Sequence, residues 1–262
     1  MIRRLALAGA LALPLGHDYG SGVAPAGVPV RWAEGTLHGF LELRTLSDSL
    51  LAHGAQLQIP RDTHIESRLE FDFGDGSVFR ESVTFTQRGV FALQRYHLVQ
   101  RGNAFAVDLD AQLDHTGEYV VQTRSHEDGK EERFTGRLDV PADLYNGLIP
   151  VIAKNLPPDH GSTVHVVAFT PQPRVIELEL IPEATNPLRF GSRTATTVHF
   201  TLKPHLGLLL GIGAALTGKS PPDSHLWIVT EDVPAFVRFE GPLYEGPVWR
   251  INLTTPRWPE TP

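Results

Sequence analysis

The sequence predicts a mainly β fold: a large, curved antiparallel sheet, shaped as a half-barrel or a barrel-like sandwich, with about 12–15 strands and one central helix. The clearest evidence is the alternation of apolar or small residues with polar ones from His64 to Phe73. A Gly-Asp-Gly-Ser turn follows, and Phe79, Val83 and Phe85 share one side of the next run. Alternation with a period of two across a glycine-rich turn is typical of an antiparallel hairpin with one buried face. The pattern recurs along most of the chain, and only one segment has a helical period.

The predicted strands are short and separated by turns, which favours a meander over βαβ units. Before the helix, the expected strands cover residues 29–33, 36–45, 50–59, 64–73, 78–87, 90–100, 104–111, 117–124 and 131–138. After it, they cover residues 162–170, 173–182, 193–203, 225–230, 234–240 and 247–254. We therefore expect a single antiparallel β domain over residues 27–262, in which the helix crosses between two halves of the sheet.

The one clear helix is predicted between these two sets of strands. Its apolar residues recur at four-residue spacing: Leu144, Leu148, Ile152 and Leu156. Asp139 is the expected N-cap, and Pro141 lies near the expected first turn. Gly147 and Pro150 are expected to kink or shorten this helix, and the Pro157-Pro158 pair ends it.

A glycine-rich apolar region follows later in the chain. Its uncharged run from Leu206 to Leu216 is too short to span a bilayer, which needs about 20 apolar residues. We expect this run to form a buried strand or a second short apolar helix, with an apolar lid over a cleft as the functional alternative. Residues Gly213–Ser220 match the phosphate-binding loop pattern letter for letter. A true loop of this kind opens a helix, so the Pro221-Pro222 pair directly after it leads us to reject that interpretation.

Composition and charge exclude several classes of function. The formal net charge of −7 offers no general attraction for phosphate backbones, so nucleic acid is not an expected partner. The absence of cysteine excludes disulfides, thiolate nucleophiles and cysteine zinc sites.

The histidines are scattered without metal-ligand spacing, and Asp108, Asp110 and Asp114 lack the remaining features of a calcium loop. We expect no metal and no cofactor. With no G-x-S-x-G elbow and no serine singled out as a nucleophile, the sequence leans away from an enzyme.

The N-terminus predicts export. Arg3 and Arg4 precede an uncharged apolar run from Leu5 to Leu15, about the length of a signal-peptide core. The best candidate for the small-residue cleavage site is Ala24-Pro25-Ala26. We expect residues 1–26 to be a signal peptide and the protein to be periplasmic or secreted by a bacterium. The alternative is an ordinary disordered or strand-forming N-terminus.

Several segments carry a resemblance to known families. Three lie near the C-terminus: Thr197–Leu202, His225-Leu-Trp-Ile-Val229 and Pro234-Ala-Phe-Val-Arg-Phe239. They resemble the closing strands of an uncharacterised family of exported bacterial half-barrel proteins, in which a tryptophan-bearing strand precedes a Pro-led strand. Four more resemble a wider exported family without assigned function: His38-Gly-Phe-Leu41, Gln87-Arg-Gly-Val-Phe91, His97-Leu-Val-Gln-Arg101 and Gly241-Pro-Leu-Tyr-Glu245. The general shape is similar to the periplasmic lipoprotein carriers, where a strongly curved antiparallel sheet wraps around helices and a hydrophobic cleft. The resemblance implies a fold and a location, and it supplies no catalytic residues.

The first hypothesis for function is an exported protein that binds an apolar or amphipathic, lipid-like molecule in a half-barrel cleft. The candidate lining residues are Leu69, Phe71, Phe85, Leu148, Ile152 and Trp227. The competing interpretation is that all six fill a packed core. The alternatives for function are a structural or interaction module of the cell envelope without a ligand, and a hydrolase acting on envelope material.

Overall fold

The computed structural model describes residues 27–170, 172–190, 193–205 and 222–255, and in them fourteen strands form one sheet. All paired strands run antiparallel, and one helix, α1 (Ile149–Asn155), accompanies the sheet. The strands before the helix are β1 (Leu37–Thr45), β2 (Leu50–Pro60), β3 (Ile65–Phe73), β4 (Val78–Arg88), β5 (Val90–Arg101), β6 (Val107–Asp114), β7 (Glu118–Ser125) and β8 (Glu131–Arg137). The strands after it are β9 (Ser162–Ala168), β10 (Arg174–Phe190), β11 (Arg193–His205), β12 (Ser224–Val229), β13 (Ala235–Gly241) and β14 (Trp249–Thr254). The predicted fold class is confirmed.

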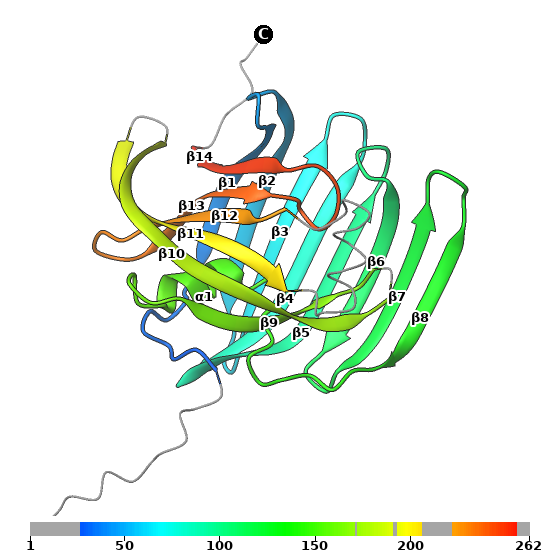
Figure 1. Cartoon of the computed structure of the whole chain (residues 1–262), viewed down its shortest axis with the longest axis horizontal. Helices are drawn as coiled ribbons and strands as arrows, with labels where there is room; N and C mark the ends of the chain where they lie inside the picture. The colour runs from blue at the N-terminus through cyan, green and yellow to red at the C-terminus, as the bar shows by residue number, and fades with distance from the viewer. Residues whose placement is uncertain (1–26, 171, 191–192, 206–221, 256–262) are drawn as a thin grey trace, which may run out of the picture.

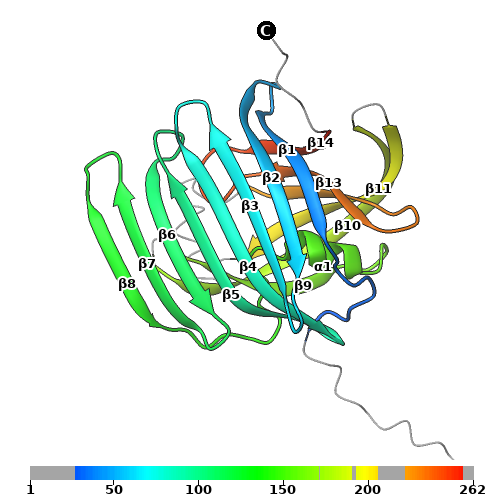
Figure 2. The same ribbon diagram turned by 180° about the vertical axis from the view of Figure 1, so that it is seen from behind.

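The sheet is a long meander that returns to its own beginning. Its spatial order is β8-β7-β6-β5-β4-β3-β2-β1-β14-β13-β12-β11-β10-β9, so the first and last strands are neighbours at its centre. Figures 1 and 2 show this sheet bent on itself, with β9 to β13 crossing one face of the layer formed by β1 to β8. Helix α1 lies between the two layers and contacts β12 and β13. The bend turns the two halves of the sheet into the two walls of an interior.

The inward-facing residues of both layers form the main hydrophobic core. The largest fully buried side chains include Phe71 and Phe79, which are opposite each other on β3 and β4. Gly54 lies opposite Phe71 on β2, and a Cβ there would come within 2.5 Å of the Phe71 ring and the Glu70 carbonyl. Glycine at that position therefore leaves room for the aromatic ring, a close approach that any side chain would block.

Helix α1 begins later than the sequence predicts. Leu148 is its N-cap and Pro150 lies in its first turn, so the expected start at Asp139 and Pro141 is wrong. The chain before the helix reverses at Gly147, whose φ is +68°, a conformation that ends any preceding helix. Among the described residues, no helix has the length and apolar composition needed to cross a bilayer.

The last residue of α1 ties the N-terminal segment to the fold. The buried Asn155 side chain accepts hydrogen bonds from the backbone N–H groups of Arg31 and Trp32, at 2.8 and 2.7 Å. It also donates to the Val151 carbonyl at 2.8 Å. One amide thereby satisfies two donors that lie outside any strand.

Other differences from the predicted elements concern strand ends. The expected strand at 29–33 is only an isolated bridge between Pro29 and Val90, and the expected strand at 104–111 begins at Val107. Strand β10 runs on to Phe190, beyond the predicted end at 182. The expected signal peptide, the apolar run at 206–216 and the rejected phosphate-loop match at 213–220 lie outside the described residues.

The two edges of the sheet are protected in different ways. Along β9, Asn146 donates to the Val167 carbonyl and accepts from its N–H, at 2.9 and 2.7 Å. The Leu144–His165 bridge adds a backbone contact to the same edge. Strand β8 forms the other edge, and most of its residues are exposed and polar or charged, which disfavours pairing with another chain.

Candidate functional site

A cavity of about 190 Å³ lies between the two walls of the bent sheet. Most of its lining is apolar and comes from both layers and from the turn into α1. The lining residues are Leu41, Gln56, Ser67, Leu69, Phe79, Glu81, Val83, Gly147, Ile149, Pro150, Phe236, Phe239, Leu243 and Ile251. An apolar interior with a few polar groups is the usual composition of a small-molecule site.

Glu81 is the ionisable residue in this lining. The Tyr96 hydroxyl donates a hydrogen bond of 2.7 Å to Oε1 of Glu81. Burial raises the pKa of the Glu81 carboxyl, and the hydrogen bond from Tyr96 opposes that rise. Burial, followed by the neighbouring carboxyl, also holds the pKa of Tyr96 well above its usual value. A carboxyl without an ion pair among the described residues thus lies in a mainly apolar wall.

Two further polar side chains share the wall with Glu81. Gln56, Leu69 and Glu81 are opposite one another across β2, β3 and β4, so they form one cross-strand row on the inner face. Ser67 lies two residues from Leu69 on the same face of β3. Neither Gln56 nor Ser67 has a hydrogen-bond partner for its side chain among the described residues. The three polar groups therefore surround Leu69 on one wall of the cavity.

Gly147 brings the turn before α1 close to this wall. A Cβ on Gly147 would clash with Cγ2 of Val83 and would lie 3.0 Å from the Tyr96 ring and 3.1 Å from the carboxyl carbon of Glu81. With its positive φ, this position requires glycine on two grounds, conformation and space. The turn packs directly over the Glu81–Tyr96 pair as a result.

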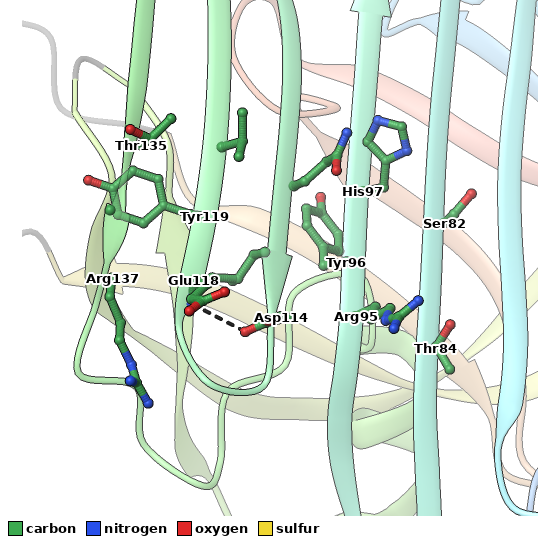
Figure 3. Close-up of a pocket in the computed structure, with 14 residues that line it drawn as sticks. Ser82, Thr84, Arg95, Tyr96, His97, Asp114, Glu118, Tyr119, Thr135 and Arg137 are labelled. Carbon is green, nitrogen blue, oxygen red and sulfur yellow. Dashed lines mark hydrogen bonds between the residues drawn. The ribbon is translucent and has the colours of Figure 1, made fainter.

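A larger hollow, of about 850 Å³, lies elsewhere, on the outer face of β4 to β8 (Figure 3). It is an open groove along two rows of mainly polar side chains that cross the strands. These are Ser82, His97, Gln112, Val120 and Thr135 in one row, and Thr84, Arg95, Asp114, Glu118 and Arg137 in the other. The second row carries both signs of charge, with the two acidic residues adjacent and an arginine on each side of them. We favour the smaller interior cavity as the binding site because it has opposed walls, an apolar lining and a partly buried carboxyl.

An aromatic and histidine cluster occupies the outer face of the other half of the sheet. His199 stacks on Trp227 with ring centroids 4.5 Å apart, and its Nε2 lies 3.0 Å from Nδ1 of His225. The Arg238 guanidinium lies 5.8 Å from the centre of the Trp227 ring. Burial, and then the nearby His225, lower the pKa of His199. Within the described part of the chain, no three histidine or acidic side chains gather as metal ligands.

The six sequence-predicted ligand residues fall in three places. Leu69 lines the cavity. Phe71, Phe85, Leu148 and Ile152 are fully buried in the core around it, with 0% exposure. Trp227 lies in the outer cluster with His199, away from the other five. Of the six predicted residues, only Leu69 lines the cavity. The four core residues pack in the interior, and Trp227 lies on the outer face, apart from the other five.

Sequence reasoning missed the most distinctive residue of the cavity, Glu81. The signal was present in β4, because Phe79, Glu81, Val83 and Phe85 all fall on one side of an alternating strand. An acidic residue in the apolar row of an amphipathic strand faces the interior and needs a partner or a function.

Comparisons with known proteins give one distant likeness. No family model matches the chain, and no curated protein matches it. A crystal structure of a β-barrel-like protein of the domain of unknown function DUF1849, from Brucella abortus, is similar with 10% identity and a TM-score of 0.43. The similar region covers 84% of this chain and 98% of that protein. At these values the likeness says nothing about ligand or activity.

Proposed function

We propose that this protein binds a small apolar or amphipathic molecule in the cavity between the walls of its bent sheet. The observation that carries the proposal is the cavity of about 190 Å³, lined by apolar side chains from both layers and by three polar groups. An engineered apolar cavity of about 150 Å³ stays dry and takes up benzene, so this space admits an aromatic ring with a short substituent. The apolar end of a larger, lipid-like molecule has the same chemistry.

Binding is tested with toluene as the probe, by thermal unfolding and by NMR titration. A ligand that binds only the folded state at ten times its dissociation constant stabilises that state by about 1.4 kcal/mol. For a domain of this size, the melting temperature should then rise by about 3–6 °C. The probe should perturb resonances of residues around Leu69.

A cavity-filling substitution provides the specific control. Leu69→Trp places an indole in the cavity and should abolish the toluene response. The same change at Leu46→Trp, in an exposed turn, should leave it intact. Equal responses in the two variants would contradict the proposal, and so would an unaltered protein that responds neither to toluene nor to substituted benzenes of similar size.

We also propose that the protein is exported through its N-terminal sequence. The support is the Arg3-Arg4 pair before the apolar run Leu5–Leu15. Expression in a bacterium, followed by cell fractionation and mass spectrometry of the recovered protein, tests this proposal. We expect a chain that begins near residue 27 outside the cytoplasm, and an intact chain that begins at Met1 in the cytoplasm would refute it.

A further inference from the structure

The cavity wall around Leu69 contains hydrogen-bond acceptors that have no partner among the described residues. Oε1 of Glu81 is occupied by the Tyr96 hydroxyl, whereas Oε2 has no hydrogen bond to any described residue. Glu81 also has no positively charged partner within the described part of the chain. A carboxylate in this position is an acceptor and a negative charge, both open to the cavity that it lines.

The neighbouring polar groups are arranged around the same residue, Leu69. Gln56 and Glu81 flank Leu69 in one cross-strand row, and adjacent strands in a sheet are about 4.8 Å apart. Ser67 lies one step along β3, on the same face. A group held above Leu69 can therefore contact the Glu81 carboxylate, the Ser67 hydroxyl and the Gln56 amide oxygen, which are three acceptors without partners among the described residues.

A primary ammonium group matches this arrangement. It carries three N–H donors and a positive charge, so it can satisfy three acceptors and neutralise the carboxylate. An anionic head would meet the Glu81 charge in a poorly solvated wall, where repulsion is strong. A neutral hydrocarbon would leave all three polar groups unpaired.

We propose that the cavity selects a small primary amine with an apolar body, its ammonium group held by Glu81, Ser67 and Gln56. This inference rests on the proposed function, because it requires the cavity to be a binding site. The cavity volume of about 190 Å³ limits the enclosed part of such a ligand to roughly an aromatic ring with a short arm. Gly147, in the turn that packs over Glu81, and Ile149, at the start of α1, also line the cavity.

The test compares four probes of similar size in calorimetric or NMR titrations: benzylamine, benzyl alcohol, toluene and benzoate. In the unaltered protein, benzylamine should bind at least about tenfold more tightly than benzyl alcohol, and benzoate should bind most weakly. This comparison needs no variant. If benzyl alcohol or toluene binds as tightly as benzylamine, the inference is wrong while the proposed function stands. If none of the four binds, the proposed function itself is refuted.

Substitutions then assign the preference to the carboxylate. Glu81→Gln keeps the size of the side chain and an acceptor for Tyr96, and it should reduce the benzylamine preference to about the level of benzyl alcohol. Glu70→Gln makes the same change on the outer face of the neighbouring strand and should leave the preference unaltered. A preference that survives Glu81→Gln, or disappears in Glu70→Gln, would overturn the assignment.

Discussion

Replacement of Gly147 by alanine should destabilise the fold through two separable effects. The residue has a φ of +68°, where a non-glycine residue is disfavoured by about 1–2 kcal/mol. The added methyl group would also clash with Val83 and press on Tyr96 and Glu81, and overpacking of this kind costs about 1–3 kcal/mol. Together, the free energy of unfolding should fall by about 2–5 kcal/mol.

Gly89 provides a matched control for the conformational effect. Its φ is +77°, and no atom lies within 4 Å of the position where a Cβ would be. Gly89→Ala should therefore cost only the conformational part, about 1–2 kcal/mol. Urea unfolding of both variants at equilibrium measures the two losses, and their difference isolates the contact with the cavity wall. If Gly147→Ala loses no more stability than Gly89→Ala, the turn does not pack on the Glu81–Tyr96 pair as described.

Three further predictions concern the polar side chains of Glu81, Asn155 and Asn146, which are partly or fully buried. Burial raises the pKa of Glu81 in the folded state, so the folded protein favours the neutral carboxyl. This contribution to the free energy of unfolding is complete below the pKa of the unfolded state, and it is lost as the pH rises through the pKa of the folded state. Glutamine mimics the neutral acid, so urea unfolding between about pH 4 and pH 8 should show Glu81→Gln gaining stability relative to the unaltered protein as pH rises; a constant difference would argue against a raised pKa. Asn155→Ala should cost about 2–4 kcal/mol and speed hydrogen exchange in residues 28–36, because two backbone donors lose their acceptor; an equal effect from the exposed Asn103→Ala would point to another cause. Asn146→Ala should leave the edge of β9 partly unpaired and increase aggregation in light scattering at fixed concentration; unchanged scattering would show that the edge is protected without this side chain.

The strands were predictable because one face of the sheet is buried. Period-two alternation located most strands to within a few residues, as in the hairpin of β3 and β4. It did not extend β10 to Phe190, because Pro182 and Pro187 argue against a strand. In the structure β10 pairs with β9 only as far as Leu180, and beyond that point one edge of β10 is free of β9, so the missing N–H groups are tolerated.

The start of the helix and the cavity depended on contacts that no local pattern contains. Leu144 has the spacing of a helical residue, yet it forms a bridge with His165 on β9. The four-residue spacing was partly a coincidence, and Gly147 marked the actual boundary. The cavity brings together Leu69 on β3 and Phe239 on β13, which line it from segments far apart in the sequence, and only tertiary packing sets that arrangement.

The neighbouring position of β1 and β14 has a consequence for how the chain folds. Leu41 and Leu43 are opposite Leu253 and Ile251, so the central pairing of the sheet joins residues separated by most of the sequence. Closing so long a loop is slow, and the strands from β2 to β8 can form hairpins well before it happens. Until that pairing forms, the edge of β1 that faces β14 has no strand beside it. We therefore expect the pairing of β1 with β14 to form late, and the interval before it forms is when the chain is most open to aggregation or capture by a chaperone.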